Sequence, residues 1–208
     1  MPESKKAKLV LLDFDGTLVE GDIFRDFIIF RLLEYQFLIR LLFAIPYFLG
    51  HKLKLMSNDK AKEKIFRALF KGESSSHFRS RVEDFWYHHG TEINPAIVDV
   101  FSNYQKEKAD FLIVSANFAP IISAFAGRNF GFDFLATELE EVDGKLSGRF
   151  ASPNCYGDEK VRRLNIRVFD RSLYSEIHAY GDSRGDLPML RWADKGYLLR
   201  RGDWRKIQ

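Results

Sequence analysis

Three short apolar segments of this sequence are each followed at once by polar residues, and this arrangement restricts the fold more than any other feature. A short apolar run is typical of a strand buried on both faces of a parallel sheet. The carboxyl ends of parallel strands meet at one edge of a sheet, where ligands bind. The segments, each with the polar residues after it, are 9–12 with Asp13 and Asp15, 111–114 with Ser115 and Ala116, and 177–180 with Asp182 and Asp186.

The acids after these segments would gather in one crevice. Burying a carboxylate beside apolar side chains is costly unless a cation or hydrogen bonds compensate. Carboxylate oxygens are ligands that Mg²⁺ prefers, so the crevice is predicted to bind Mg²⁺. Lys160, at the start of a predicted helix, can reach the same crevice. The acids concerned are Asp13, Asp15, Asp182 and Asp186.

This set of residues suits phosphoryl transfer. An aspartate such as Asp13 is a competent nucleophile toward phosphorus and forms an aspartyl-phosphate. Asp15 can protonate the leaving alkoxide and then activate water. Mg²⁺ and Lys160 would neutralise the phosphoryl oxygens, while the Ser115 hydroxyl and nearby N–H groups hold them. Gly16 lets the backbone turn close to the phosphate. The sequence therefore predicts a Mg²⁺-dependent phosphomonoester hydrolase.

Strands and helices alternate after residue 90, whereas residues 22–89 show helical periodicity without strand signals. We therefore expect an α/β fold, a doubly wound and mainly parallel sheet with a helical insertion after the first strand. Residues 1–20 and 91–208 would form the core, and residues 21–90 the insertion. The predicted helices are 22–48, 59–70, 75–88, 95–108, 119–129, 159–169 and 187–193. The predicted strands are 8–14, 111–114, 134–141, 145–150, 177–180 and 197–200, with Asp143-Gly144 as a hairpin turn.

The same residues carry a family resemblance. The sequence resembles the haloacid dehalogenase superfamily, in its subfamily IB, the phosphoserine-phosphatase-like branch. The connecting segments "ATELEEVDGKLSGRF", "CYGDEKVRRL" and "YGDSRGDLPML" also resemble this branch. The resemblance implies a Rossmann-like core with a helical cap and a phosphatase activity. Its four motifs, in order, are Asp13-Phe14-Asp15-Gly16-Thr17, Val114-Ser115, Lys160, and Gly181-Asp182 with Asp186.

The resemblance also implies a role for each motif residue. Asp13 would be the nucleophile, and Asp15 would act as acid and base. The residues implied to bind phosphate are Gly16, Thr17, Ser115, Ala116 and Lys160. The groups implied to hold Mg²⁺ are the Asp13 carboxylate, the Asp15 carbonyl and Asp182, with Asp186 either among the ligands or just outside them.

Two positions differ from the phosphoserine phosphatases that the sequence resembles. In those enzymes an acid shortly after the first motif binds the substrate amine, and Asp22 stands there in place of the usual Glu. Asp22 is therefore the candidate for substrate specificity. Ser115-Ala116-Asn117 also stands where Ser-Gly-Gly is usual. The motifs predict the reaction and leave the alcohol of the substrate undefined.

Residues 23–56 are rich in Phe, Leu and Ile. Their longest uncharged run, 41–50, is far shorter than the roughly 20 residues of a membrane-spanning helix. We therefore predict no transmembrane segment and interpret the stretch as the packed interior of the cap. Two alternatives stay open. The stretch could form an apolar lid that accepts a lipid phosphate such as phosphatidylglycerophosphate, or it could make peripheral contact with a membrane interface.

Composition narrows the partners and the compartment. The formal charge of +3 over 208 residues favours anionic partners and is too weak to imply nucleic acid. Cys155 is the single cysteine, and the start of the sequence carries no secretory signal, so we expect a reducing, cytoplasmic location. The expected partner is a small-molecule phosphate ester. Residues 60–64 are interpreted as a solvated helix face, and the sequence predicts no oligomeric state.

Two other functions use similar residues. A phosphotransferase or phosphomutase would differ only in passing the phosphoryl group to another hydroxyl, and the sequence shows no obvious second phosphate site. A phospho-accepting signalling module would have neither an acid two residues beyond the accepting Asp nor an inserted helical block. Asp15 and residues 21–90 therefore favour the hydrolase.

Overall fold

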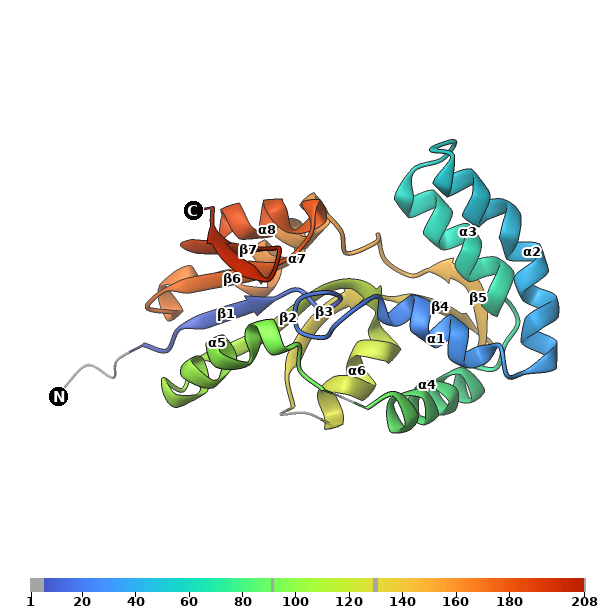
Figure 1. Cartoon of the computed structure of the whole chain (residues 1–208), viewed down its shortest axis with the longest axis horizontal. Helices are drawn as coiled ribbons and strands as arrows, with labels where there is room; N and C mark the ends of the chain where they lie inside the picture. Colours follow the sequence, from blue (N-terminus) through green and yellow to red (C-terminus); the bar gives the residue numbers. More distant parts are fainter. Residues whose placement is uncertain (1–5, 91, 129–130, 208) are drawn as a thin grey trace.

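A six-stranded sheet in the order β3-β2-β1-β6-β7-β8 forms the centre of the protein (Figure 1). The computed structural model describes residues 6–90, 92–128 and 131–207. All strand pairs of this sheet are parallel except the pair of β7 with β8, so the mainly parallel sheet predicted from the sequence is confirmed. The strands are β1 (Leu9–Leu12), β2 (Asp110–Phe118), β3 (Asp133–Thr137), β6 (Ile177–Gly181), β7 (Lys195–Arg200) and β8 (Asp203–Lys206).

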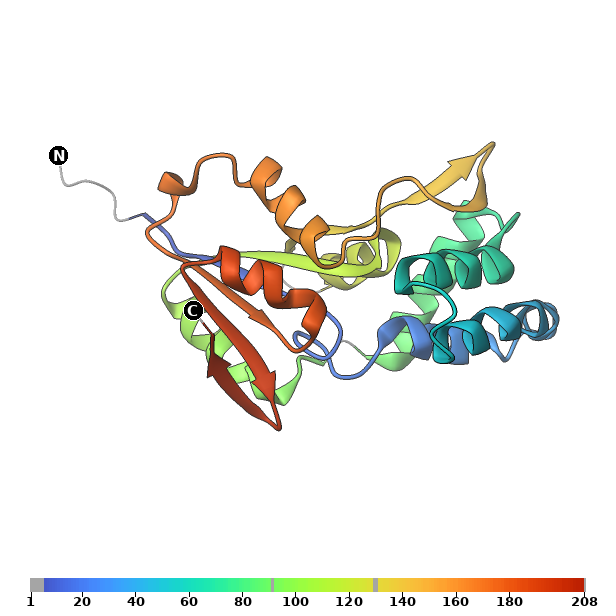
Figure 2. The ribbon, with the colours of Figure 1, turned by 90° about the horizontal axis from the view of Figure 1, so that it is seen from above.

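Helices cover both faces of the sheet (Figures 1 and 2). Val10 and Leu12 of β1 belong to the hydrophobic core that includes residues of α5 and α6. Leu9 and Leu11 belong to a second core with residues of α7 and α8. Because successive side chains of a strand point to opposite faces, β1 is buried on both, as its apolar run predicts. These helices are α5 (Pro95–Lys106), α6 (Ala119–Arg128), α7 (Asp158–Arg167) and α8 (Leu187–Trp192).

Four further helices follow β1 and lie beyond one end of the sheet, away from the N-terminus (Figure 1). The predicted single helix over residues 22–48 is wrong, because the chain turns at residues 32–34. Phe27 and Phe37, on either side of this turn, both pack on Phe70, with ring centroids 6.1 and 5.5 Å away. Two separate helices therefore bury two apolar faces on one partner. The four are α1 (Ile23–Arg31), α2 (Tyr35–Lys52), α3 (Asn58–Phe70) and α4 (Ser75–His89).

A small hairpin joins the sheet layer to these helices. The predicted strand 134–141 is in fact two strands, since β3 belongs to the main sheet and β4 (Leu139–Val142) pairs with β5 (Lys145–Phe150). The turn between β4 and β5 is Asp143-Gly144, as predicted, with both φ angles positive. Leu146 exchanges backbone hydrogen bonds with the segment between α3 and α4, accepting from Gly72 at 2.8 Å and donating to Glu73 at 2.9 Å. The hairpin thereby ties the two parts of the chain together.

Strand β8 was not predicted. It pairs antiparallel with β7, with Leu199 opposite Trp204. Residues 201–202 form the turn, with φ of 55° at Arg201 and 88° at Gly202. This edge strand is short and its residues are mostly polar, so it contains no apolar run that would predict a strand.

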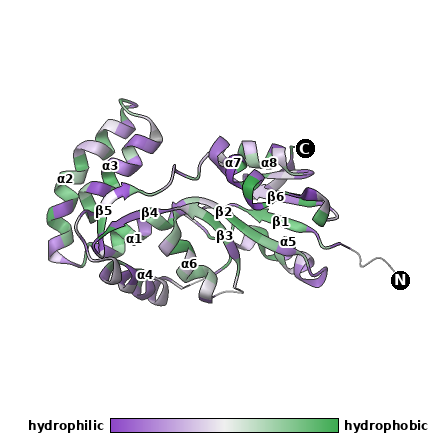
Figure 3. Cartoon of the chain, turned by 180° about the vertical axis from the view of Figure 1, so that it is seen from behind, coloured by the Kyte–Doolittle hydropathy of each residue, from purple (hydrophilic) through white to green (hydrophobic). Residues whose placement is uncertain are grey.

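The helical insertion and the sheet layer share one aromatic interior. Phe118, at the end of β2, contacts Phe24 of α1 and Phe66 of α3, with ring centroids 4.8 and 4.7 Å apart. Hydrophobic residues run along the central strands and along α1 and α2 in Figure 3. Within the described residues, no helix combines the length and apolar character needed to cross a membrane.

Candidate active site

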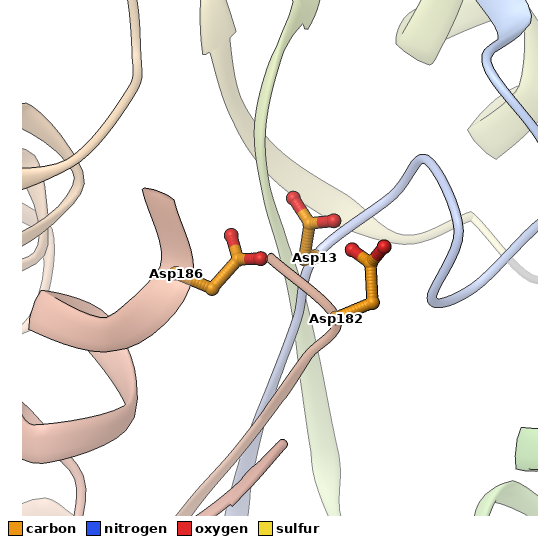
Figure 4. Close-up of side chains that lie close together, drawn as sticks. All are labelled: Asp13, Asp182 and Asp186. Atoms are coloured by element: carbon orange, nitrogen blue, oxygen red, sulfur yellow. The ribbon is translucent and has the colours of Figure 1, made fainter. Parts of the chain in front are cut away.

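Three carboxylates come together where β1 and β6 end (Figure 4). The two strands pair in parallel with Leu12 opposite Tyr180, so the residues that follow leave the sheet side by side. One oxygen from each of Asp13, Asp182 and Asp186 lies within 4.8 Å of the other two. Asp13 and Asp186 are buried, and Asp182 is partly buried. The structure therefore brings three of the predicted site residues together.

Glycine makes this close approach possible. Gly16 has a φ of +76°, and a Cβ at this position would lie 2.6 Å from Oδ2 of Asp182. Only glycine accepts both the left-handed backbone and the lack of space. The neighbouring Thr17 is fully buried, and its hydroxyl donates to Oδ1 of Asp182 at 3.5 Å. The first motif thus shapes the loop that contacts Asp182.

Lys160 lies inside the acidic cluster. It is 1% exposed, and its Nζ donates to Asp13 Oδ1, Asp186 Oδ1 and the Val114 carbonyl, each at 2.6 Å. Burial by itself lowers the pKa of Lys160, but the Asp13 and Asp186 carboxylates outweigh it and raise that pKa above its usual range. Lys160 is therefore a charged donor between two carboxylates. Its position in the first turn of α7 directs it there.

Asp15 has a different environment. Its Oδ1 accepts from the Ile23 N–H at 2.7 Å, and the Asn117 side-chain amide donates to Oδ1 and Oδ2 at 3.3 and 3.1 Å. Burial raises the pKa of Asp15 to about 6, against the lowering effect of these hydrogen bonds. A carboxyl with such a pKa can donate a proton and accept one near neutral pH. The Asn117 contact was not predicted, because the sequence showed only a bulkier residue than usual.

The second motif lies on β2, which extends four residues beyond the predicted end at 114. Ser115 is buried, and its Oγ accepts from the Asn117 N–H at 2.9 Å. Ala116 lines the cavity, and its carbonyl accepts from Thr137 Oγ1 at 2.8 Å. Ser115, Gly16 and Thr17 are not among the residues that line the cavity. Their binding of phosphate stays a prediction.

A cavity of about 640 Å³ lies between the strand ends and the helical insertion. One wall carries the acids, together with Lys160 and Asn117. The opposite wall comes from α1, α2 and α3 and is mainly apolar. Its apolar residues are Phe24, Ile28, Ile29, Phe48, Ala61 and Ile65. Its polar residues are Asp22, Arg25, His51 and Lys62. The cavity therefore suits a ligand with a charged end and a partly apolar end.

Lys62 corrects the interpretation of residues 60–64 as a solvated face. Lys60 and Lys64 are exposed, but Lys62 lines the cavity and its Nζ donates to the Ala116 carbonyl at 2.5 Å and to Asn154 Oδ1 at 3.3 Å. Burial lowers the pKa of Lys62 to about 8, although nearby carboxylates oppose this shift. Lys62 precedes the buried Ile65 and Phe66 by three and four residues. This helical spacing was the signal that could have identified it.

Asp22, the candidate for substrate specificity, lies at the edge of the site, and three other polar residues lie outside it. Asp22 is exposed and lines the cavity, where its Oδ1 caps α1 by accepting from the Arg25 N–H at 2.9 Å. Arg184 is exposed and does not line the cavity, so nothing links it to a ligand there. His88 and His89 are exposed at the end of α4 and do not line the cavity.

The donor set fits a hard divalent cation. Burial and the neighbouring Asp186 raise the pKa values of both Asp13 and Asp182. The single ammonium group of Lys160 therefore does not compensate all of the negative charge of the three carboxylates. Ser183 donates to Asp186 Oδ2 from its N–H at 2.9 Å and from its hydroxyl at 2.7 Å, while Lys160 occupies Oδ1. In the described part of the chain, Asp13 Oδ2 and Asp182 Oδ2 carry no such donor. Oxygen ligands of this kind suit Mg²⁺.

Comparisons with known proteins agree with this geometry. A family model described as haloacid dehalogenase-like hydrolase matches residues 10–191. Protein CicA of Caulobacter vibrioides is 32% identical over 200 residues, covering 93% of this chain and 87% of CicA.

Solved structures of similar fold include a Bordetella pertussis protein of unknown function, at 20% identity and a TM-score of 0.76 over 93% of this chain and 89% of that one. A phosphoserine phosphatase structure, an analogue of the phospho-aspartyl intermediate, is also 20% identical, with a TM-score of 0.63 over 93% of this chain and 86% of that one. The doubly wound fold is therefore shared with the phosphoserine phosphatases, as the sequence resemblance implied.

Proposed function

The chain belongs to the haloacid dehalogenase-like hydrolases, and on that premise we propose that it hydrolyses phosphomonoesters through an aspartyl-phosphate on Asp13. The observation that carries this proposal is the pairing of Asp13 with Lys160 at 2.6 Å, beside a cavity that Asp15 also lines. A nucleophile, a cation and a titratable acid thus face one space. We propose residues 21–90 as its cap and residues 1–20 and 91–208 as its core.

The Asp13 carboxylate would attack phosphorus with one of its oxygens, while Lys160 keeps the carboxylate in place through its hydrogen bond to Oδ1. An oxygen of Asp13 bonds to phosphorus as the bond from phosphorus to the alcohol oxygen breaks. Asp15 gives its proton to the leaving alkoxide. Asp15 then accepts a proton from water, whose oxygen bonds to phosphorus and releases the Asp13 carboxylate and phosphate. A pKa of about 6 at Asp15 allows both transfers near neutral pH.

Mg²⁺ would be held by Asp13, the Asp15 carbonyl and Asp182. When bound, it supplies positive charge that neutralises the phosphoryl oxygens. Asp186 would stay just outside the ligands, because Lys160 and Ser183 already occupy both of its oxygens. Asp186 would then position Lys160 and the loop after β6.

The phosphate would lie between Lys160 and the ends of β1 and β2. Gly16 and Thr17 shape the loop after β1, and Ser115 and Ala116 follow the buried apolar residues 112–114 of β2. These are the residues we propose to hold phosphate, through backbone N–H groups and the Ser115 hydroxyl. Asp22 would contact the alcohol from the mouth of the cavity.

The apolar wall of the cavity favours a partly apolar alcohol. Phe24, Ile28 and Ile65 face the same cavity as the acids, and Lys62 adds a cation beside them. A second candidate function follows from this wall, namely hydrolysis of a lipid phosphate such as phosphatidylglycerophosphate. Its acyl or glycerol part would occupy the apolar wall, while Lys62 would bind a second anionic group.

Replacing Asp13 with Asn tests the proposal. Release of phosphate from a generic aryl phosphate in the presence of Mg²⁺ should fall to background, because the amide is a poor nucleophile. Asp143→Asn is the matched control, since Asn suits the same exposed hairpin turn and should keep full activity. Wild-type turnover by Asp13→Asn would contradict the mechanism.

The substrate would be sought in a panel of phosphoserine, histidinol phosphate, a lysolipid phosphate and phosphatidylglycerophosphate. Phosphate and alcohol should appear in equal amounts. A deficit of free phosphate in the presence of other alcohols would instead identify a phosphotransferase or phosphomutase.

A further inference from the structure

Helix α2 exposes apolar side chains on the side that faces away from the rest of the protein. Phe43 is 68% exposed and Leu42 is 65% exposed, values unusual for such large hydrophobic residues on a well-packed helix. The exposed residues continue past the end of α2 into the loop before α3. We call this surface the outer cap face, and its residues are Leu38, Ile39, Leu42, Phe43, Ile45, Leu49, Leu53 and Leu55.

The spacing of these residues shows that the exposure is a property of one face. Phe37 and Ala44 are buried, and Leu41 and Tyr47 pack against the core. The inner face of α2 is therefore packed against the rest of the protein. Leu38, Leu42 and Leu49 repeat at intervals of four and seven on the other side, where a water-facing helix would carry charges. Contiguous exposed apolar surface of this kind marks an interaction site.

The charges around the outer cap face point to an anionic partner. No Asp or Glu occurs from Tyr35 to Ser57, whereas Lys52 and Lys54 are basic. Lys52 and Lys54 are exposed and alternate with the exposed Leu53 and Leu55. A second copy of this face would bring its own lysines and no acids to pair with them. An apolar face bordered by lysines instead matches the interface of an anionic bilayer.

The position of the face suits a planar partner. α2 lies at the end of the molecule farthest from the N-terminus, in both the front and back views (Figures 1 and 3). The loop from α2 to α3, which carries Leu53 and Leu55, is at the tip of this helical pair in Figure 1. A flat surface can therefore reach the face without contacting the sheet layer.

Helix α2 contributes both to the outer cap face and to the cavity. Phe48 of α2 and Ile29 of α1 line the cavity and are 38% and 55% exposed. We infer that the outer cap face docks the protein on an anionic lipid bilayer and places the mouth of the cavity at the headgroup level. The docking itself goes beyond the proposed phosphatase, and only delivery of a lipid phosphate to the cavity rests on that function.

Vesicle co-sedimentation of the full chain tests the inference without any turnover. The wild type should sediment with vesicles of mixed phosphatidylcholine and phosphatidylglycerol and much less with phosphatidylcholine alone. Phe43→Glu should reduce binding at least about tenfold, because it places a carboxylate in the apolar centre. Lys52→Gln with Lys54→Gln should reduce it about fivefold for each lysine removed.

Phe169→Glu is the matched control, since Phe169 is 83% exposed and lies outside the outer cap face. It should bind vesicles like the wild type. Both Phe→Glu variants should keep the thermal midpoint and the turnover of a soluble aryl phosphate, so a folding defect or failure of the phosphatase proposal would be seen separately.

Three results would overturn the docking inference. The first is wild-type chain that stays in the supernatant with every vesicle. The second is equal binding by Phe43→Glu, or equal binding to phosphatidylcholine alone. The third is a wild-type dimer that Phe43→Glu converts to a monomer in light scattering without vesicle binding, which would assign the face to a second copy.

Discussion

In the absence of Mg²⁺, Lys160 should contribute several kcal/mol to the free energy of unfolding. The Lys160→Met variant removes the ammonium group and keeps an unbranched side chain. In the wild type, Nζ lies 2.6 Å from oxygens of both Asp13 and Asp186, and all three side chains are buried. The variant leaves two neighbouring carboxylates without their cation. Breaking a buried ion pair from one side costs about 3–5 kcal/mol.

This cost converts to a change in melting temperature. For a domain of this size, 1 kcal/mol corresponds to about 2–4 °C, so Lys160→Met should melt about 6–20 °C below the wild type. The measurement is thermal unfolding by circular dichroism at pH 8 with EDTA. Lys106→Met, at an exposed position on α5, should melt with the wild type.

The stability lost in Lys160→Met should depend on pH in a defined direction. Burial raises the pKa of Asp186, but the attraction of Lys160 outweighs it and leaves that pKa below the usual value. The stability from this pair is therefore present above the usual carboxyl pKa and is lost only as pH falls through the lowered pKa. Without Lys160, the pKa values of Asp13 and Asp186 rise, so the variant loses stability as pH rises. The deficit should therefore be smaller at pH 5 than at pH 8.

A second substitution and added Mg²⁺ test the role of Lys160 further. Adding Asp186→Asn to Lys160→Met should recover part of the loss, because one buried carboxylate is then neutral. Excess Mg²⁺ should also reduce the difference in melting temperature between Lys160→Met and the wild type. A Lys160→Met midpoint within about 2 °C of the wild type at pH 8 with EDTA would refute the account of Lys160 as the compensating cation.

Three other variants probe the site. Lys62→Met should raise KM about tenfold for an ester with a second anionic group and leave KM for an aryl phosphate unchanged, as steady-state kinetics beside Lys60→Met would show. Asn117 lowers the pKa of Asp15, so Asn117→Ala should raise that pKa and keep Asp15 protonated to a higher pH. The alkaline limb of the pH profile of kcat should therefore move up by about one pH unit or less. An unmoved limb would show that Asn117 does not affect the pKa of Asp15. Gly16→Ala should cut kcat more than about tenfold by displacing Asp182, whereas Gly144→Ala, equally strained but with nothing within 4 Å of its Cβ, should not.

Much of the fold could be predicted from apolar runs and turn residues that are close together in the sequence. Residues 9–12 are apolar at every position because β1 is buried on both faces, and a single sequence shows this directly. Asp143-Gly144 predicts its turn through backbone preference alone. Strand pairing in parallel then places the residues after β1 and β6 side by side, so the cluster of Asp13, Asp182 and Asp186 follows from topology.

Other features depended on contacts between distant residues. The turn at residues 32–34 contains no glycine or proline, and its cause is the packing of Phe27 and Phe37 on the same Phe70. The pairing of β4 with β5 in a separate sheet depends on backbone bonds to residues 72–75. Helical and strand periodicity carry no information on such partners.

The order of apolar and charged residues along the chain sets which carboxylates end buried parallel strands, so the acidic cluster was predictable from the sequence. The surface that faces those carboxylates depends on how the helices after β1 pack. Lys62 and the apolar wall belong to α1, α2 and α3, and Phe48, Lys62 and Ile65 lie 35, 49 and 52 residues after Asp13 along the chain. Whether a lysine on a helix is solvated or lines a cavity depends on the surface opposite it, and local sequence does not specify that surface.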